Sequence, residues 1–284
     1  MNRILAEEII SYQKVQISSA NDISKCTCQF LTVNKGVPNA HGTGVFIKVN
    51  NIHFLITAAH VIEDYMGEVF IRFEENCITR IAFEISINKT NGKRKDDKTD
   101  IAILKLDEET VKTLIGFYEF LDETELGINH ELNYLPMYLA HGYPCTLTKI
   151  KYKKNEIVAN STFFITKPAD KIIYDKLECG IDKNLIICYN RNDLINSRTQ
   201  QIGTGPDLYG MSGSGLWYIP KQVLDSNQRV KKKLVSLLTE WPLKDKTHVI
   251  STRIDVITEI LRVTYGLNLP TSNVFRSKFD IENI

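Results

Sequence analysis

The sequence lacks a long hydrophobic run and lacks a strong excess of charge of either sign. Its best apolar stretch, Phe54 to Ile62, is interrupted by Thr57 and His60, whereas a membrane-spanning helix needs about 18 consecutive apolar residues. With 35 basic and 34 acidic residues the formal charge is +1, so no long-range field attracts nucleic acid or an anionic bilayer. We therefore expect neither nucleic-acid nor membrane binding.

Cysteine is also sparse, with six residues in a chain of 284. Small secreted domains that depend on disulfides have a much denser framework, so free thiols are expected. The Cys26-Thr27-Cys28 segment has no second pair at zinc-finger spacing. We expect no metal site and no cofactor.

The N-terminal residues argue against a secretory signal. Glu7 and Glu8 follow Met1 before an apolar core of sufficient length can form. The chain is therefore expected to be intracellular, in the cytoplasm.

Short segments rich in β-branched and aromatic residues recur about every ten residues, with turn residues between them, which indicates an all-β sandwich or barrel. The expected strands of the first half are 42–49, 52–57, 69–74, 80–88 and 101–106. Those of the second half lie at 137–151, 156–165, 185–189, 215–218, 234–239 and 248–250.

A helix is expected near the C-terminus. Thr252 and Asp255 have the spacing of a capping box, and Gly266 is a typical helix stop. The predicted organisation is an N-terminal extension (1–24), a first β-barrel (25–126), a second β-barrel (127–250) and a C-terminal helix with a tail (251–284).

Three motifs carry the candidate chemistry. His60 ends a Thr-Ala-Ala-His run, Asp100 opens an apolar strand, and Ser212 lies within the glycine turn 210–215. A serine hydroxyl is a weak nucleophile until a base accepts its proton, and imidazole is such a base near neutral pH. A buried carboxylate then orients the imidazole and compensates its positive charge.

The order His, Asp, Ser along the chain is that of chymotrypsin. Together with the Gly42-Thr43-Gly44 strand and the Gly142-Tyr143-Pro144 turn, these motifs resemble the trypsin/chymotrypsin-like serine peptidases. The resemblance is closer to their bacterial branch, which includes the high-temperature-requirement proteases and the glutamyl endopeptidases. It implies two packed antiparallel six-stranded β-barrels with a C-terminal helix, without an appended peptide-binding domain.

The resemblance also implies the catalytic roles. His60 is the base, Asp100 the orienting acid and Ser212 the nucleophile, while the amides of Gly210 and Ser212 form the oxyanion hole. Asp96 and Asp97 lie in a lysine-rich turn and are expected to be solvated, and Ser214 is expected to be a small residue at the start of a strand.

A second catalytic order can be written with Ser212, Glu240 and His248. The elbow of that hydrolase class needs glycine two residues after the serine, where this chain has Ser214, and the βαβ alternation of that class is missing. His141 is expected near a turn at the surface.

Met211 precedes the candidate nucleophile where digestive enzymes have an aspartate that pairs with a newly cut N-terminus. Activation through that salt bridge is therefore not expected. The serine turn is then ordered from the start, or is ordered by a partner or an oligomer contact, and both alternatives remain open.

Substrate recognition is expected at two segments. Thr239, Glu240 and Trp241 resemble the edge that pairs with an extended substrate backbone. Asp207 lies one residue beyond the position that reads charge in trypsin, so it is either a reader of basic side chains or a turn residue.

The sequence thus predicts an intracellular serine endopeptidase that acts on a protein or peptide, with restricted regulatory cleavage. The alternatives are a catalytically silent protease-like binding module and an esterase.

Overall fold

The structure, a computed structural model, describes residues 14–63, 69–73, 77–90, 92–135, 137–151, 156–195, 201–222, 230–275 and 281–283. Residues 1–13 of the expected extension and Glu74 of an expected strand lie outside these ranges. Residues 14–24 are helical. No helix in the described part of the chain is long and apolar enough to cross a membrane.

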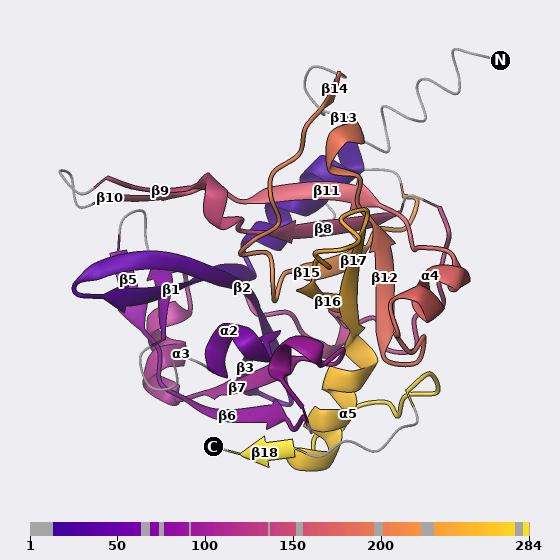
Figure 1. The fold of residues 1–284 in the computed structure, drawn as a ribbon. Coiled ribbons are helices and arrows are strands. Elements are labelled where there is room, and N and C mark those ends of the chain that lie inside the picture. The colour runs from indigo at the N-terminus through magenta and orange to yellow at the C-terminus, as the bar shows by residue number, and fades with distance from the viewer. Residues whose placement is uncertain are drawn as a thin grey trace.

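Two antiparallel sheets build the molecule, one in the lower part and one in the upper part of Figure 1. The first has the order β18-β6-β7-β3-β2-β1-β4-β5. Its strands are β1 (Thr27–Asn34), β2 (Val37–Val49), β3 (Ile52–Ala58), β4 (Phe70–Phe73), β5 (Cys77–Arg80), β6 (Phe83–Asn88), β7 (Ile101–Leu106) and β18 (Ile281–Asn283).

The second sheet has the order β11-β8-β15-β16-β17-β12. Its strands are β8 (Tyr138–Gly142), β11 (Thr162–Thr166), β12 (Asn184–Cys188), β15 (Gly215–Tyr218), β16 (Lys233–Glu240) and β17 (His248–Arg253). The Cys188 amide donates to Lys167 O (3.0 Å), and the Ala169 amide donates to Ile186 O (2.8 Å). These bonds join the chain after β11 to β12 and close the sheet on itself.

Short hairpins, helices and 3-10 turns lie between the strands of the two sheets. They are the hairpins β9 (Thr148–Lys151) with β10 (Glu156–Ala159) and β13 (Leu194–Ile195) with β14 (Ile202–Gly203), the helices α2 (Ala59–Glu63), α3 (Glu108–Leu114), α4 (Lys171–Lys176) and α5 (Ile254–Thr264), and the 3-10 turns η1 (Arg94–Asp96), η2 (Glu123–Glu125), η3 (Cys145–Leu147) and η5 (Arg191–Asp193).

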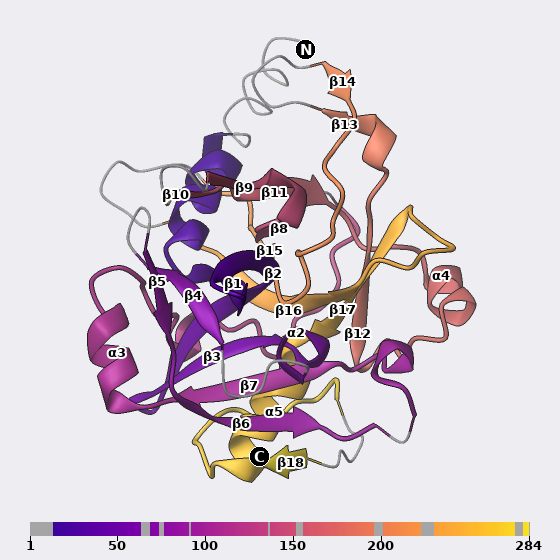
Figure 2. The ribbon, with the colours of Figure 1, turned by 60° about the vertical axis from the view of Figure 1, so that its left-hand side comes forward.

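Alternation along the strands divides the core into layers. On β3, Leu55 faces the interior of the first sheet, while Phe54 and Ile56 face a second cluster that contains Trp217 and Leu237 of the other sheet. Successive strand residues point to opposite faces, so one strand serves both layers. The buried face of α5 packs into the shared cluster, and Figure 2 shows this helix beside the first sheet.

The all-β fold with two sheets and a C-terminal helix is confirmed, with differences of detail. The first sheet has eight strands rather than six. The expected strand 80–88 is divided at Ile81, whose amide turns to Val69 O, and residues 281–283 pair with β6 at the sheet edge.

The predicted capping box is wrong. Arg253 is the N-cap of α5 and makes no side-chain cap bond, because Thr252 still belongs to β17 and its hydroxyl donates to Thr99 O (2.6 Å). The expected helix stop is present, since Gly266 has φ +65°, a conformation that favours glycine.

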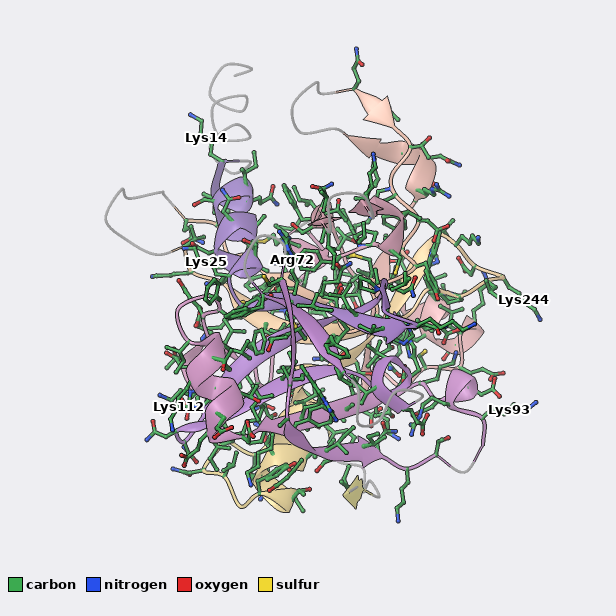
Figure 3. All side chains as sticks on the ribbon, turned by 90° about the vertical axis from the view of Figure 1, so that its left-hand side faces the viewer. Lys14, Lys25, Arg72, Lys93, Lys112 and Lys244 are labelled. Carbon is green, nitrogen blue, oxygen red and sulfur yellow. The ribbon has the colours of Figure 1, made fainter. Side chains whose placement is uncertain are left out.

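Lysine side chains labelled in Figure 3 extend outward from different segments of the chain. Lys14 lies on the N-terminal helix, Lys112 on α3, and Lys244 follows β16. These lysines do not form one patch.

Candidate active site

His60 is positioned by the end of β3. That strand pairs with β7, with Ala58 opposite Ile101, and the chain then turns into α2, in which His60 is the second residue. The Ala59 amide donates to Asp100 O (3.0 Å). The short helix thus begins directly beside Asp100, and the His60 side chain remains 40% exposed.

Asp100 holds both the ring and the backbone of His60. Its Oδ2 lies 2.5 Å from His60 Nδ1, and its Oδ1 accepts the His60 amide N–H at 3.0 Å. Only 6% of the Asp100 side chain is exposed. An ionised carboxylate accepts, so Nδ1 donates and Nε2 is the ring nitrogen left to take a proton. This is the geometry of a base with its orienting acid.

The serine turn comes from the second sheet and lies against the first. The Thr43 amide of β2 donates to Ser212 O (2.9 Å), and the Gly213 amide donates to Leu238 O of β16 (2.7 Å). Thr57, three residues before His60, donates its hydroxyl to Thr43 O (2.7 Å). These bonds place the backbone of Ser212 beside the end of β3, which leads into α2 and His60.

Two amides of this turn donate to no acceptor in the part of the chain that the structure describes. The amides of Met211 and Ser214 donate to Leu208 O and Met211 O, both at 2.9 Å. Among the residues that the structure describes, the amides of Gly210 and Ser212 donate to none. Gly210 has φ +93°, which glycine adopts readily. Two such donors, the amide of the serine itself and that of the glycine two residues earlier, suit a developing oxyanion.

The hydroxyl of Ser212 itself is not hydrogen-bonded to His60 in the described contacts. Catalytic hydrogen bonds of unliganded sites are often long and tighten only when substrate is bound. The site therefore has an assembled His–Asp pair and a serine turn fixed through its main chain.

Ser214, the other serine of the turn, is fully buried. Its hydroxyl faces Met211 Sδ at 3.7 Å, and a Cβ on Gly142 would collide with it. Ser212 is partly exposed, so Ser212 is the serine of this turn that a substrate can reach.

The expected substrate-binding residues differ in their surroundings. Asp207 Oδ1 accepts the Tyr209 amide (3.1 Å), and Oδ2 lies 3.8 Å from Arg191 Nη1. A carboxylate that caps a turn and faces an arginine favours the turn role over the reading of basic side chains.

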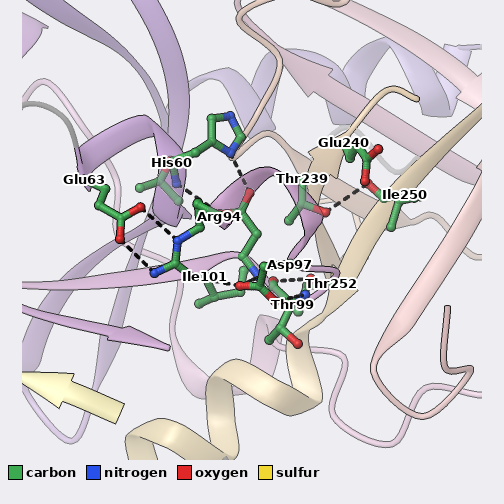
Figure 4. Close-up of polar contacts among 12 residues, drawn as sticks. His60, Glu63, Arg94, Asp97, Thr99, Ile101, Thr239, Glu240, Ile250 and Thr252 are labelled. Carbon is green, nitrogen blue, oxygen red and sulfur yellow. Dashed lines mark hydrogen bonds and ion pairs between the residues drawn. The ribbon is translucent and has the colours of Figure 1, made fainter. Parts of the chain in front are cut away.

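The remaining candidates lie at the end of β16. Thr239 is buried and donates to Ile250 O (3.4 Å), as Figure 4 shows. Glu240 pairs with Lys98 at 2.6 Å, and the Trp241 indole donates to Lys246 O.

The alternative order Ser212, Glu240, His248 is not assembled. His248 Nδ1 lies 3.1 Å from Asp245 Oδ1, while Glu240 is engaged by Lys98.

His141, expected at the surface, is 2% exposed on β8. Burial lowers its pKa to about 4.

Sequence reasoning missed Thr43, which joins the two halves of the site. Its hydroxyl donates to Gly210 O (2.9 Å) and accepts the Tyr143 amide (3.0 Å). The sequence feature that could have identified Thr43 is the pair of glycines on either side of it, Gly42 and Gly44. Gly44 has no room for a Cβ beside Phe30 and Leu55, so the glycines mark a close approach.

No protein-family model matches the chain, and no curated protein matches it significantly. Among solved structures, it is similar to GrC, with a TM-score of 0.50, 11% identity, and coverage of 86% of this chain and 96% of that one. At this identity the likeness concerns the fold alone. The fold is chymotrypsin-like.

Two further structures are similar at lower scores. A serine endoprotease from Yersinia pestis gives a TM-score of 0.47 at 13% identity, with 87% of this chain covered. This chain spans 65% of the length of that protein. Protease Anisep from Arthrobacter nicotinovorans gives 0.46 at 10% identity, with 81% of this chain and 90% of that chain covered.

Proposed function

We propose that the protein is an intracellular serine endopeptidase that cleaves a protein partner at restricted sites. Ser212 is the nucleophile, His60 the general base and Asp100 its orienting acid. The proposal is carried by one observation, the Asp100 carboxylate that binds both Nδ1 and the amide of His60.

The reaction follows from these groups. Ser212 Oγ attacks the carbonyl carbon of the scissile bond, and its proton passes to His60 Nε2. The carbonyl oxygen becomes an oxyanion between the amides of Gly210 and Ser212. His60 then gives the proton to the departing amine, which leaves an acyl ester on Ser212. Water attacks this ester, again with His60 as base, and the acyl group leaves as a carboxylic acid while His60 returns the proton to Ser212 Oγ.

The exposure of the two sides of the site supports this direction of proton transfer. Asp100 is nearly buried and His60 is partly exposed, so the acid holds the ring from inside while the other ring nitrogen faces the substrate side. Without the Asp100 carboxylate, neither the tautomer nor the orientation of the His60 ring would be fixed.

Labelling with a fluorophosphonate probe tests the proposal. We expect the purified protein to be labelled, and expect Ser212→Ala and His60→Ala to abolish labelling. Ser214→Ala is the matched control, because it removes the other hydroxyl of the same turn, and it should be labelled like the wild type.

Absence of labelling in folded wild-type protein would refute a site that is active in the isolated chain, and would leave a serine turn that needs an ordering partner or a binding module. Labelling that survives Ser212→Ala would refute the assigned nucleophile. Once the protein is labelled, a peptide library separates an endopeptidase, which cleaves it, from an esterase, which hydrolyses only ester substrates.

A further inference from the structure

Arg94 lies between the helix that carries His60 and the loop that carries Asp100. Its Nε and Nη2 donate to Glu63 Oε2 and Oε1, each at 3.0 Å, and Glu63 is the last residue of α2. Its Nη1 donates to Asp97 Oδ2 (2.8 Å), as Figure 4 shows. One guanidinium thus binds two carboxylates from the two segments of the candidate pair.

Asp97 connects Arg94 to the backbone of Asp100. Its Oδ2 accepts the Asp100 amide (3.0 Å), and its Oδ1 accepts the Thr99 amide (2.9 Å). Asn88 extends the network, because its Oδ1 accepts the Ile101 amide (2.7 Å) and its backbone O accepts from Arg94 (2.9 Å). The backbone on both sides of Asp100 is therefore held. Asp97 is thus not the solvated turn residue that the sequence predicted.

The backbone of Asp100, which these hydrogen bonds hold, is strained. Asp100 has φ +39°, a conformation that residues other than glycine rarely adopt and that persists only when the surroundings determine it. Arg94 and Asp97 side chains are 13% and 11% exposed, so their charge-assisted bonds are largely shielded from water. A bidentate arginine fork also fixes direction, which a lysine cannot do.

We propose that Arg94 is a positioning residue for the His60–Asp100 pair, acting through Glu63 on one side and Asp97 on the other. This inference rests on the proposed function for its effect on rate, but its structural part concerns only the pair. Without Arg94, α2 and the loop shift relative to each other, and the base loses its alignment. Binding of a small probe does not depend on that alignment.

The test compares Arg94→Lys, Arg94→Ala and Glu63→Gln with the control Lys105→Gln. Lys105 lies on β7, the strand that follows Asp100, and forms an ion pair with Glu84 (2.9 Å) that touches neither α2 nor the loop. Glu63 is 41% exposed, so its variant should fold even if Arg94→Ala does not. Circular dichroism and thermal unfolding verify the fold.

Two readouts are measured on the full chain. The first is the low-field proton resonance of the His60–Asp100 hydrogen bond, assigned by its loss in His60→Ala. The second is the fluorophosphonate reaction, divided into the maximal labelling rate and the probe concentration for half-maximal labelling.

We expect Arg94→Ala to shift or broaden the resonance and to lower the maximal rate about 100-fold, as misplacement by about 1 Å can do. Arg94→Lys and Glu63→Gln should lower it about 10-fold, with the half-maximal concentration unchanged. An unchanged resonance in folded Arg94 and Glu63 variants would overturn the inference. If the wild type is not labelled but its resonance responds to these variants, the proposed function fails and the positioning role stands.

Discussion

The two halves of the candidate site are fixed by different means. On the first sheet, the His60–Asp100 pair is held by side chains, with Arg94 bound to two carboxylates. On the second sheet, the Ser212 turn is held by main-chain bonds, by the uncharged Thr43 hydroxyl and by glycines that leave no room for a Cβ. The first half depends on charge and the second on backbone shape, so they should respond to different perturbations.

The largest expected effect is in the serine half, at Gly213. Its φ is +84°, and an added Cβ would lie 1.9 Å from Thr43 O and 2.2 Å from Thr57 Oγ1. Both neighbours are fixed by the bond between them, so the clash cannot be relieved locally. We expect Gly213→Ala to lower the free energy of unfolding by about 3–5 kcal/mol, as measured by urea denaturation.

Gly36→Ala is the matched control for this variant. Gly36 has φ +77° but nothing within 4 Å of an added Cβ. Gly36→Ala should therefore lower the free energy of unfolding only by the cost of placing alanine in a left-handed backbone conformation, about 1–2 kcal/mol. Equal losses in the two variants would show that strain in φ, and not the contact with Thr43, determines the turn.

Acid should also weaken the serine half. His141 is buried on β8 opposite Gly215, which follows the serine turn, and burial lowers its pKa from 6.5 to about 4. Below pH 6.5 the unfolded chain binds a proton that the folded one does not. Stability therefore falls as the pH decreases from about 6.5 to about 4, by up to about 3 kcal/mol.

Thermal unfolding between pH 7 and pH 4 checks this prediction. His141→Gln removes the titrating group, so its stability should change less with pH than that of the wild type, whatever its stability at pH 7. Hydrogen exchange should show loss of protection in β8 and β15 before β3 and β7. Parallel pH curves for the two proteins would contradict the assignment to His141.

A substitution at Gly210 tests the serine half through its effect on the labelling rate. With φ +93°, an added Cβ would lie 2.5 Å from Cys145 Sγ and 2.7 Å from Cys145 N. The turn must shift and carry the Gly210 amide away from the proposed position of the oxyanion. We expect Gly210→Ala to reduce fluorophosphonate labelling about 100-fold. Gly203→Ala, which has open space around the added Cβ, should leave labelling unchanged, and a normal rate in Gly210→Ala would exclude this amide.

The sequence predicted local features of both halves and missed the contacts between distant segments. The ends of β3 and β7, next to which His60 and Asp100 lie, follow from apolar strands with clear boundaries. The sequence could not identify Arg94, because its role depends on Glu63, 31 residues earlier, and because Lys93 and Lys95 flank it directly. The capping box failed for the same reason, since the hydroxyl of Thr252 is used by a distant carbonyl.

The smallest expected effect is at a contact that connects the halves. Lys98, in the Asp100 loop, pairs with Glu240 at the end of β16 at 2.6 Å, with side chains 28% and 33% exposed. Partly exposed pairs contribute about 0.2–1 kcal/mol. The loop backbone has its own support, because Asn184 Nδ2 donates to Lys98 O (2.6 Å).

We therefore expect Lys98→Gln and Glu240→Gln to change the free energy of unfolding by less than about 1 kcal/mol and to leave the labelling rate within about twofold of the wild type. A double-mutant cycle over both positions measures their coupling. A loss of labelling of about tenfold or more in either single variant would show that the two halves are linked by this charge pair. Since the bond from the Asn184 side-chain amide to Lys98 O already fixes the loop against the second sheet, such a result would require the side chains of Lys98 and Glu240 themselves to act on the substrate or on Asp100.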